Sequence, residues 1–94
     1  MFNIFSAGTF SFWGCYRNDG LHLIHEIDDD EAGLRSQQEF IVPREDTEKL
    51  FGLISEKELI ERGRKTGSSG LLAYLDAQGI SYRRQFSDQG QDNG

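Results

Sequence analysis

Apolar and polar residues alternate along most of the first half of the chain, and this period of two predicts β-strands. Over residues 9–17, Phe10, Phe12 and Tyr16 share one face, while Trp13 and Cys15 lie on the other. A strand with this pattern places one face in the core. The same alternation predicts a short strand at residues 2–5 and further strands at 21–27, 34–42 and 80–86.

Turn signals join the first of these strands into an antiparallel meander. Residues 18–20 read Asn-Asp-Gly, and these residue types tolerate the positive φ that tight hairpin turns require. Strands 9–17 and 21–27 are therefore expected to pair with each other. The acids at 28–31, followed by Ala32 and Gly33, are expected to form the next turn.

Helix signals occupy most of the second half of the chain. Pro43 suits the first turn of a helix, where its missing N–H costs nothing, and an apolar stripe follows at positions 50–54. Ser55 and Glu58 have the spacing of a capping box, so a second helix is predicted over residues 56–65.

Residues 66–70, rich in Gly and Ser, predict a break before a third helix that ends at Gly79. The fold class predicted is therefore α+β, with an antiparallel β-meander of three to five strands and about three helices packed on one face. Residues 1–86 are expected to form a single domain. Residues 87–94 have little to bury and are expected to be a disordered C-terminal tail.

His22 and His25 have a spacing that suggests a metal site on a helix. On a strand, residues three apart point to opposite faces, so the two imidazoles cannot chelate one ion. No metal and no other cofactor is therefore predicted. We expect instead a half-buried His25 that hydrogen-bonds to a neighbour, and an exposed His22.

Acidic residues end the segment that contains the histidines, and they form the candidate partner-binding site. Its members are Glu26, Asp28, Asp29, Asp30 and Glu31. They lack the alternate ligand spacing and the distal bidentate Glu of an EF-hand loop, so the pattern does not favour calcium binding. Two interpretations remain open: a solvated turn, as is common for runs of like charge, or a surface that binds a basic protein partner.

Cys15 is the single cysteine, which excludes an internal disulfide and a Cys-rich zinc module and suits a reducing compartment. A nucleophilic cysteine needs a base, and strand 9–17 contains no histidine, so we predict a packing residue and no enzyme activity. No apolar run approaches the roughly 20 residues that span a bilayer, and the N-terminus lacks the basic start of a signal peptide. A cytoplasmic protein without a membrane partner is expected.

Charge is distributed unevenly along the chain, whose formal net charge is -6. Residues 1–61 hold thirteen acidic and five basic residues, whereas residues 62–94 hold three acidic and five basic ones. The acidic majority argues against a nucleic-acid partner and favours a basic one. The five bases of the second segment nevertheless suggest a small cationic patch: Arg62, Arg64, Lys65, Arg83 and Arg84. With the helices predicted beside them, they outline a helix-turn-helix over residues 55–86, so a DNA-binding regulator is the alternative function.

Three parts of the chain carry a resemblance to a known family: a short aromatic β-meander, the strand-to-helix passage FIVPREDTEKLFGLIS with its capped helix, and the terminal segment YLDAQGISYRR. In this plan, which covers most of residues 1–86, the chain resembles small bacterial immunity proteins. Those proteins neutralise the toxin domains of contact-dependent inhibition and related polymorphic toxin systems. The resemblance implies a non-catalytic toxin inhibitor that binds the basic active-site cleft of a cognate, nuclease-like toxin. Acidic residues fit this role because they imitate the phosphates that such a cleft attracts.

Overall fold

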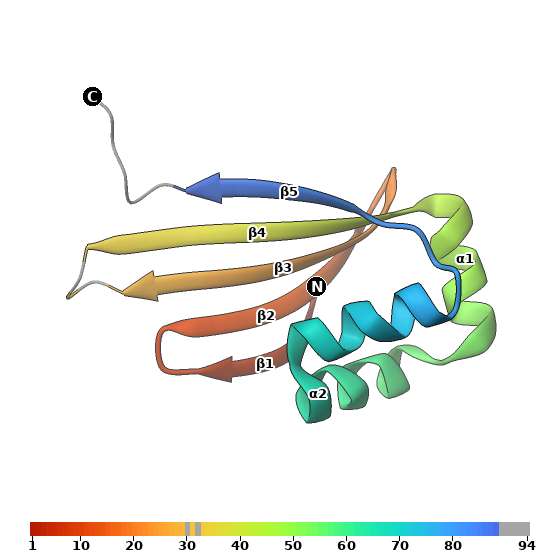
Figure 1. Ribbon diagram of the computed structural model, residues 1–94, viewed down its shortest axis with the longest axis horizontal. Coiled ribbons are helices and arrows are strands. Elements are labelled where there is room, and N and C mark those ends of the chain that lie inside the picture. The colour runs from red at the N-terminus through yellow and green to blue at the C-terminus, as the bar shows by residue number, and fades with distance from the viewer. Residues whose placement is uncertain (30, 32, 89–94) are drawn as a thin grey trace.

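The computed structural model describes residues 1–29, 31 and 33–88, which form a five-stranded sheet and two helices (Figure 1). The strands lie in the order β1-β2-β3-β4-β5, and every neighbouring pair is antiparallel. The predicted α+β class and the antiparallel meander are therefore confirmed. The elements are β1 (Phe2–Ala7), β2 (Phe10–Arg17), β3 (Gly20–Asp29), β4 (Leu34–Pro43), α1 (Arg44–Leu53), α2 (Glu56–Ala77) and β5 (Arg83–Asp88).

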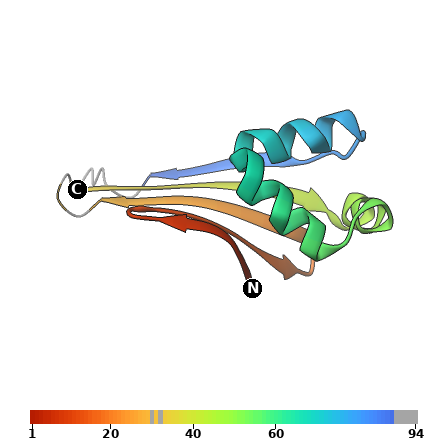
Figure 2. The ribbon, with the colours of Figure 1, turned by 90° about the horizontal axis from the view of Figure 1, so that it is seen from below.

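The predicted number of three helices is wrong, because residues 56–77 form one element, α2, but the predicted break at residues 66–70 is present within it as a non-helical residue. Gly67 has φ 75° and ψ -177°, which is not a helical conformation, so α2 bends sharply there. Figures 1 and 2 show its two halves meeting at this bend in a V. Glycine reaches a positive φ at little steric cost, which explains why the chain can turn within a run of helical residues.

Local signals fix both ends of α2 as the sequence predicts. The hydroxyl of Ser55 accepts a hydrogen bond from the backbone N–H of Glu58 (3.1 Å), and the Glu58 carboxylate accepts one from the backbone N–H of Ser55 (3.0 Å). At the other end, Gly79 has φ 72° and donates its N–H to Asp76 O, while Ile80 donates to Leu75 O. This pair of bonds is a Schellman motif, which satisfies the last carbonyls of the helix.

β5 begins three residues later than the predicted strand 80–86. Ile80 is buried, but its backbone N–H is already used in the motif that closes α2, so it cannot pair with β4. β5 also extends to Asp88, two residues into the segment predicted to be a tail. The rest of that tail, residues 89–94, lies outside the described residues.

The helices lie over one face of the sheet (Figure 2). Their side chains pack against the sheet to form the main core. α2 contacts β1, whereas α1 contacts β3 and β4. Because side chains alternate along a strand, only every second residue of β3 and β4 takes part in this core. The buried members are Ile4, Phe12, Leu21, Leu23, Phe40, Val42, Leu50, Leu59, Leu71, Leu72, Leu75 and Ile80.

The opposite face of the sheet has neither helix upon it (Figure 2). Ile24 and Ile41 on this face are nevertheless only 1% and 5% exposed. In the strand register Trp13 lies opposite Ile24, and Ile41 lies opposite His22. Side chains of neighbouring strands therefore shield one another on this face, as cross-strand pairs do in antiparallel sheets.

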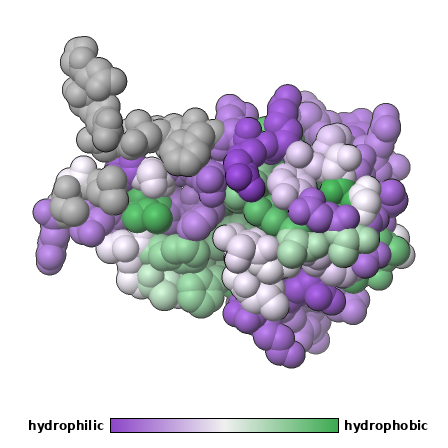
Figure 3. Space-filling view, in the orientation of Figure 1, coloured by the Kyte–Doolittle hydropathy of each residue, from purple (hydrophilic) through white to green (hydrophobic). Residues whose placement is uncertain are grey.

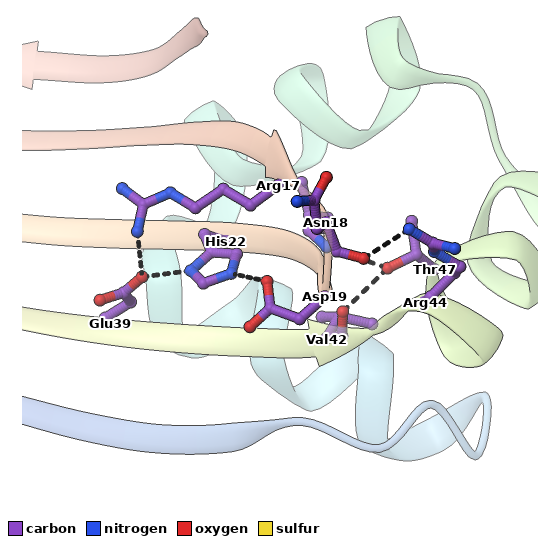
Figure 4. Close-up of polar contacts among 9 residues, drawn as sticks. Arg17, Asn18, Asp19, His22, Glu39, Val42, Arg44 and Thr47 are labelled. Carbon is purple, nitrogen blue, oxygen red and sulfur yellow. Dashed lines mark hydrogen bonds and ion pairs between the residues drawn. The ribbon is translucent and has the colours of Figure 1, made fainter.

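The β2–β3 turn is fastened to the start of α1 (Figure 4). Arg44 donates a hydrogen bond to Asn18 O (2.6 Å), and Leu21 donates its N–H to the Thr47 hydroxyl (3.1 Å). The predicted hairpin is present, but only Gly20 adopts a positive φ, 135°. A Cβ on Gly20 would lie 2.0 Å from Val42 O, so glycine is required there. These contacts hold the start of β3 in place.

None of the described helices is both long and apolar enough to cross a lipid bilayer.

Two helical glycines provide a matched test of the packing between α2 and β1. A Cβ on Gly63 would lie 2.5 Å from Cγ2 of Ile4, whereas a Cβ on Gly52 of α1 would meet nothing within 4 Å. We expect Gly63→Ala to lower the free energy of unfolding by about 1–3 kcal/mol through overpacking. Gly52→Ala should raise it by up to about 1 kcal/mol, because alanine favours helix. Urea unfolding measures both, and stabilisation by Gly63→Ala would contradict the close approach.

Candidate functional site

The acidic segment lies at the end of β3 that projects away from the helices (Figure 1). Asp28 and Asp29 were expected in a turn, but they are the last two residues of β3 and pair with Arg35 and Leu34 of β4. The expected turn therefore starts later than predicted, because the β3–β4 ladder continues through these acids. Of the other predicted site residues, Glu26 lies within β3, Glu31 is exposed in the turn, and Asp30 lies outside the described residues.

Strand alternation divides the acids between the two faces of the sheet. Glu26 and Asp28 share the face that lacks helices, and Asp29 lies on the other. Asp28 accepts hydrogen bonds from Arg35, the closer at 3.2 Å, and its backbone N–H donates to Thr9 O (2.8 Å). The acids are thus held on paired strands, with Arg35 as a cation at the same end of the sheet.

On the helix-bearing face, the sheet extends beyond the helices and carries an aromatic patch, which we define as Phe5, Phe10, His25 and Ile27. The rings of Phe5 and Phe10 meet edge to face with centroids 5.4 Å apart, and Phe10 lies 4.4 Å from the His25 ring. Phe10 also pairs across the strands with Ile27, and Phe5 is 39% exposed. Figure 3 shows a hydrophobic area beside the helices over this part of the sheet.

The environment of His22 differs from the expected one, whereas that of His25 agrees in part, because His25 is half-buried as predicted. His25 was predicted to hydrogen-bond to a neighbour, but its Nε2 is buried and has no partner. Burial lowers the pKa of His25 below its ordinary value, because the aromatic surroundings disfavour the imidazolium. His22 was predicted to be exposed, but it is only 4% exposed and lies within a network of charged side chains.

Carboxylates engage both ring nitrogens of His22 (Figure 4). Nε2 lies 2.6 Å from Asp19 Oδ1, and Nδ1 is in hydrogen-bond contact with Glu39 Oε2, which also lies 3.7 Å from Arg17 Nη1. Each ring nitrogen of His22 therefore has a carboxylate oxygen as its partner. The hydrogen bond from His22 lowers the pKa of Asp19, and the charges of His22 and Arg83 act in the same direction.

Cys15 lies directly opposite His22 in the strand register. The absence of histidine from its own strand was the basis for predicting a packing residue, yet the neighbouring strand supplies one. The carboxylates of Asp19 and Glu39 already occupy both nitrogens of that imidazole, so neither is free to accept the Cys15 proton. Within the described part of the chain, no three His, Cys, Asp or Glu side chains are grouped to hold a metal ion.

The five bases of the C-terminal third do not gather into one patch. Arg83 and Arg84 are consecutive in β5 and so point to opposite faces of the sheet. Arg84 lies over the Phe40 ring at 5.4 Å, and Arg62 over the Tyr74 ring at 4.1 Å. Arg64 donates a hydrogen bond to Ile4 O (2.7 Å). Arg62, Arg64 and Lys65 line one pocket, but they share it with Glu58 and Glu61, so the predicted patch of five bases is not assembled.

Sequence reasoning missed both the aromatic patch and the His22 network. Each depends on cross-strand register: Phe10 meets His25 from another strand, and Glu39 is separated from His22 by 17 positions. One local signal was present, since Asp19 lies three residues before His22 across a predicted turn.

No protein family, curated protein or solved structure was found to match the chain.

The burial of His25, whose Nε2 has no hydrogen-bond partner, makes the stability of the fold depend on pH. The ordinary pKa is 6.5 and the pKa in the fold is lower, so on acidification the unfolded chain takes up the proton first. The free energy of unfolding should therefore fall as the pH decreases through about 6.5. In the variants His25→Leu and His25→Gln, the decrease in the free energy of unfolding that His25 causes on acidification should be absent, whatever the absolute stability of each variant. Urea unfolding at a series of pH values between about 8 and 5.5 measures how the free energy of unfolding depends on pH. The same pH dependence in both variants as in the wild type would contradict the prediction.

The His22 network predicts unequal effects for its two carboxylates. The Glu39 side chain is 18% exposed and that of Asp19 55%. Glu39→Gln should therefore lower the free energy of unfolding by about 1–3 kcal/mol, the usual worth of a hydrogen bond to a charged group. Asp19→Asn should lower the free energy of unfolding by less, because solvent screens the interaction of an exposed pair. Urea unfolding at neutral pH compares the variants, and an equal or larger loss in Asp19→Asn would contradict this ranking.

Proposed function

We propose that this chain is a non-catalytic, immunity-type protein that binds a basic protein partner through the acidic end of β3 and the turn after it. The partner is a cognate toxin, with a nuclease-like active-site cleft as the surface that is blocked. The observation that carries the proposal is the β3–β4 ladder, which continues through Asp28 and Asp29 and presents acids on paired strands.

Rigid presentation supports this role. Strand pairing already orders the backbone of Glu26, Asp28 and Asp29, so binding would sacrifice little conformational entropy there. The net charge of -6 adds a long-range attraction for a basic partner, which accelerates association. The non-catalytic part of the proposal is supported by His22, whose nitrogens are both engaged by carboxylates opposite Cys15.

Charge reversal tests the proposed surface in cells that produce a candidate nuclease toxin domain together with this chain. The test variant is Asp28→Lys, Asp29→Lys, Glu31→Lys, and the matched control is Glu48→Lys, Glu61→Lys, Asp76→Lys. Loss of one desolvated acid from an interface costs on the order of 2–5 kcal/mol, so the test variant should bind at least about a hundredfold more weakly.

The wild type and the control variant should protect growth, whereas the test variant should not. Thermal melting of the purified variants verifies that each one folds. If the folded test variant binds and protects like the wild type, the acidic end of β3 is not the interface.

A further inference from the structure

The aromatic patch lies where the main core reaches the surface. Phe12 and Leu23 lie beneath the helices and are buried, whereas Phe10 and Ile27, further along the same strands, are only partly covered. Phe5 adds a side chain that is 39% exposed. Grouped aromatic and aliphatic side chains on an uncovered sheet face are typical of the centre of a protein interface.

His25 gives this patch a polar atom without a partner. Its Nε2 is shielded from solvent by neighbouring side chains and forms no hydrogen bond. A buried polar group left unpaired destabilises a fold, so its presence at an interface centre is consistent with a function there. The patch is therefore not simply an extension of the core.

Acidic residues adjoin the patch directly. Ile27 is followed by Asp28 and Asp29, and Asp29 lies on the same sheet face as Ile27. The Asp28 N–H donates to Thr9 O, next to Phe10, so the acidic end of β3 is fastened beside the patch. An apolar centre with an acidic rim matches a partner surface that has an apolar centre and a basic rim.

We propose that the aromatic patch and the acidic end of β3 form one composite docking surface, whose occupant is a protein segment with an apolar side chain flanked by Lys or Arg. This inference rests on the proposed function and adds the specificity of the site: the acids attract the segment, and the patch selects for its apolar side chain. A second copy of this chain is disfavoured as the occupant, because patch-to-patch contact would bring two sets of these acids together.

Two fluorescein-labelled hexapeptides test the apolar part of this surface. One carries Leu-Phe between two Lys-Arg pairs, and the other carries Ser-Ser at the same place. Fluorescence anisotropy with the intact chain should show about tenfold tighter binding of the Leu-Phe peptide, since anchoring aromatics are worth more than about 1 kcal/mol. Phe5→Ser should abolish the tighter binding of the Leu-Phe peptide. The control variant is Leu53→Ser on α1, where the native leucine is 50% exposed, and it should still bind the Leu-Phe peptide more tightly. Circular dichroism verifies that both variants fold.

The outcomes separate the composite surface from the proposed function. Three outcomes would overturn the composite surface. The two peptides could bind with equal affinity, neither could bind measurably, or Phe5→Ser and Leu53→Ser could weaken binding of the Leu-Phe peptide equally. If both peptides bind the native chain equally well and this binding disappears in the charge-reversal variant Asp28→Lys, Asp29→Lys, Glu31→Lys, the acidic surface of the proposed function stands. Unchanged binding in that variant would count against the proposed function itself. Self-association that Phe5→Ser removes would assign the patch to a second copy and overturn the inference.

Discussion

The register between β3 and β4 is the constraint on which the other features depend. These strands pair without a break from Gly20 opposite Pro43 to Asp29 opposite Leu34. Because the side-chain period is two, this register places Leu21 and Leu23 against the helices and His22 on the opposite face. A slip of one residue would bury an imidazole in the leucine core. The contacts of Arg44 and Thr47 with the β2–β3 turn help to exclude that slip, since they attach the start of β3 to α1.

The same register sorts the acids into two groups with different physical roles. Asp19 and Glu39 contact the two ring nitrogens of His22, and Glu39 also lies near Arg17, so these two acids are engaged by side chains within the fold. The acids near the end of β3 outnumber the one base in the same region, Arg35. Net charge alone does not distinguish these groups. The proposed function rests on the acids at the end of β3.

Much of the fold follows from local patterns, whereas the candidate site does not. Alternation predicts the strands and which residues of β3 share a face, and the Ser55–Glu58 spacing predicts the start of α2. The half-buried position of His25 is predicted correctly, but the burial of His22 and the unpaired Nε2 of His25 are not, because each depends on residues from another strand. The bend at Gly67 was taken for a helix boundary, since a Gly- and Ser-rich segment signals a break without indicating whether helix resumes at once. Local sequence cannot supply these distant neighbours.

The length of the strands relative to the helices explains why a surface remains for binding. β3 and β4 are each ten residues long, and the helices pack toward the end that carries the β2–β3 turn. At the other end of the sheet, which the helices do not cover, the apolar side chains are Phe5, Phe10 and Ile27, and the unpaired Nε2 of His25 lies among them. The covered end supplies the stability of the sheet, so the other end can keep apolar and acidic side chains exposed without unfolding. A strand that is rigid at one end and open at the other can therefore bind a partner without first having to fold around it.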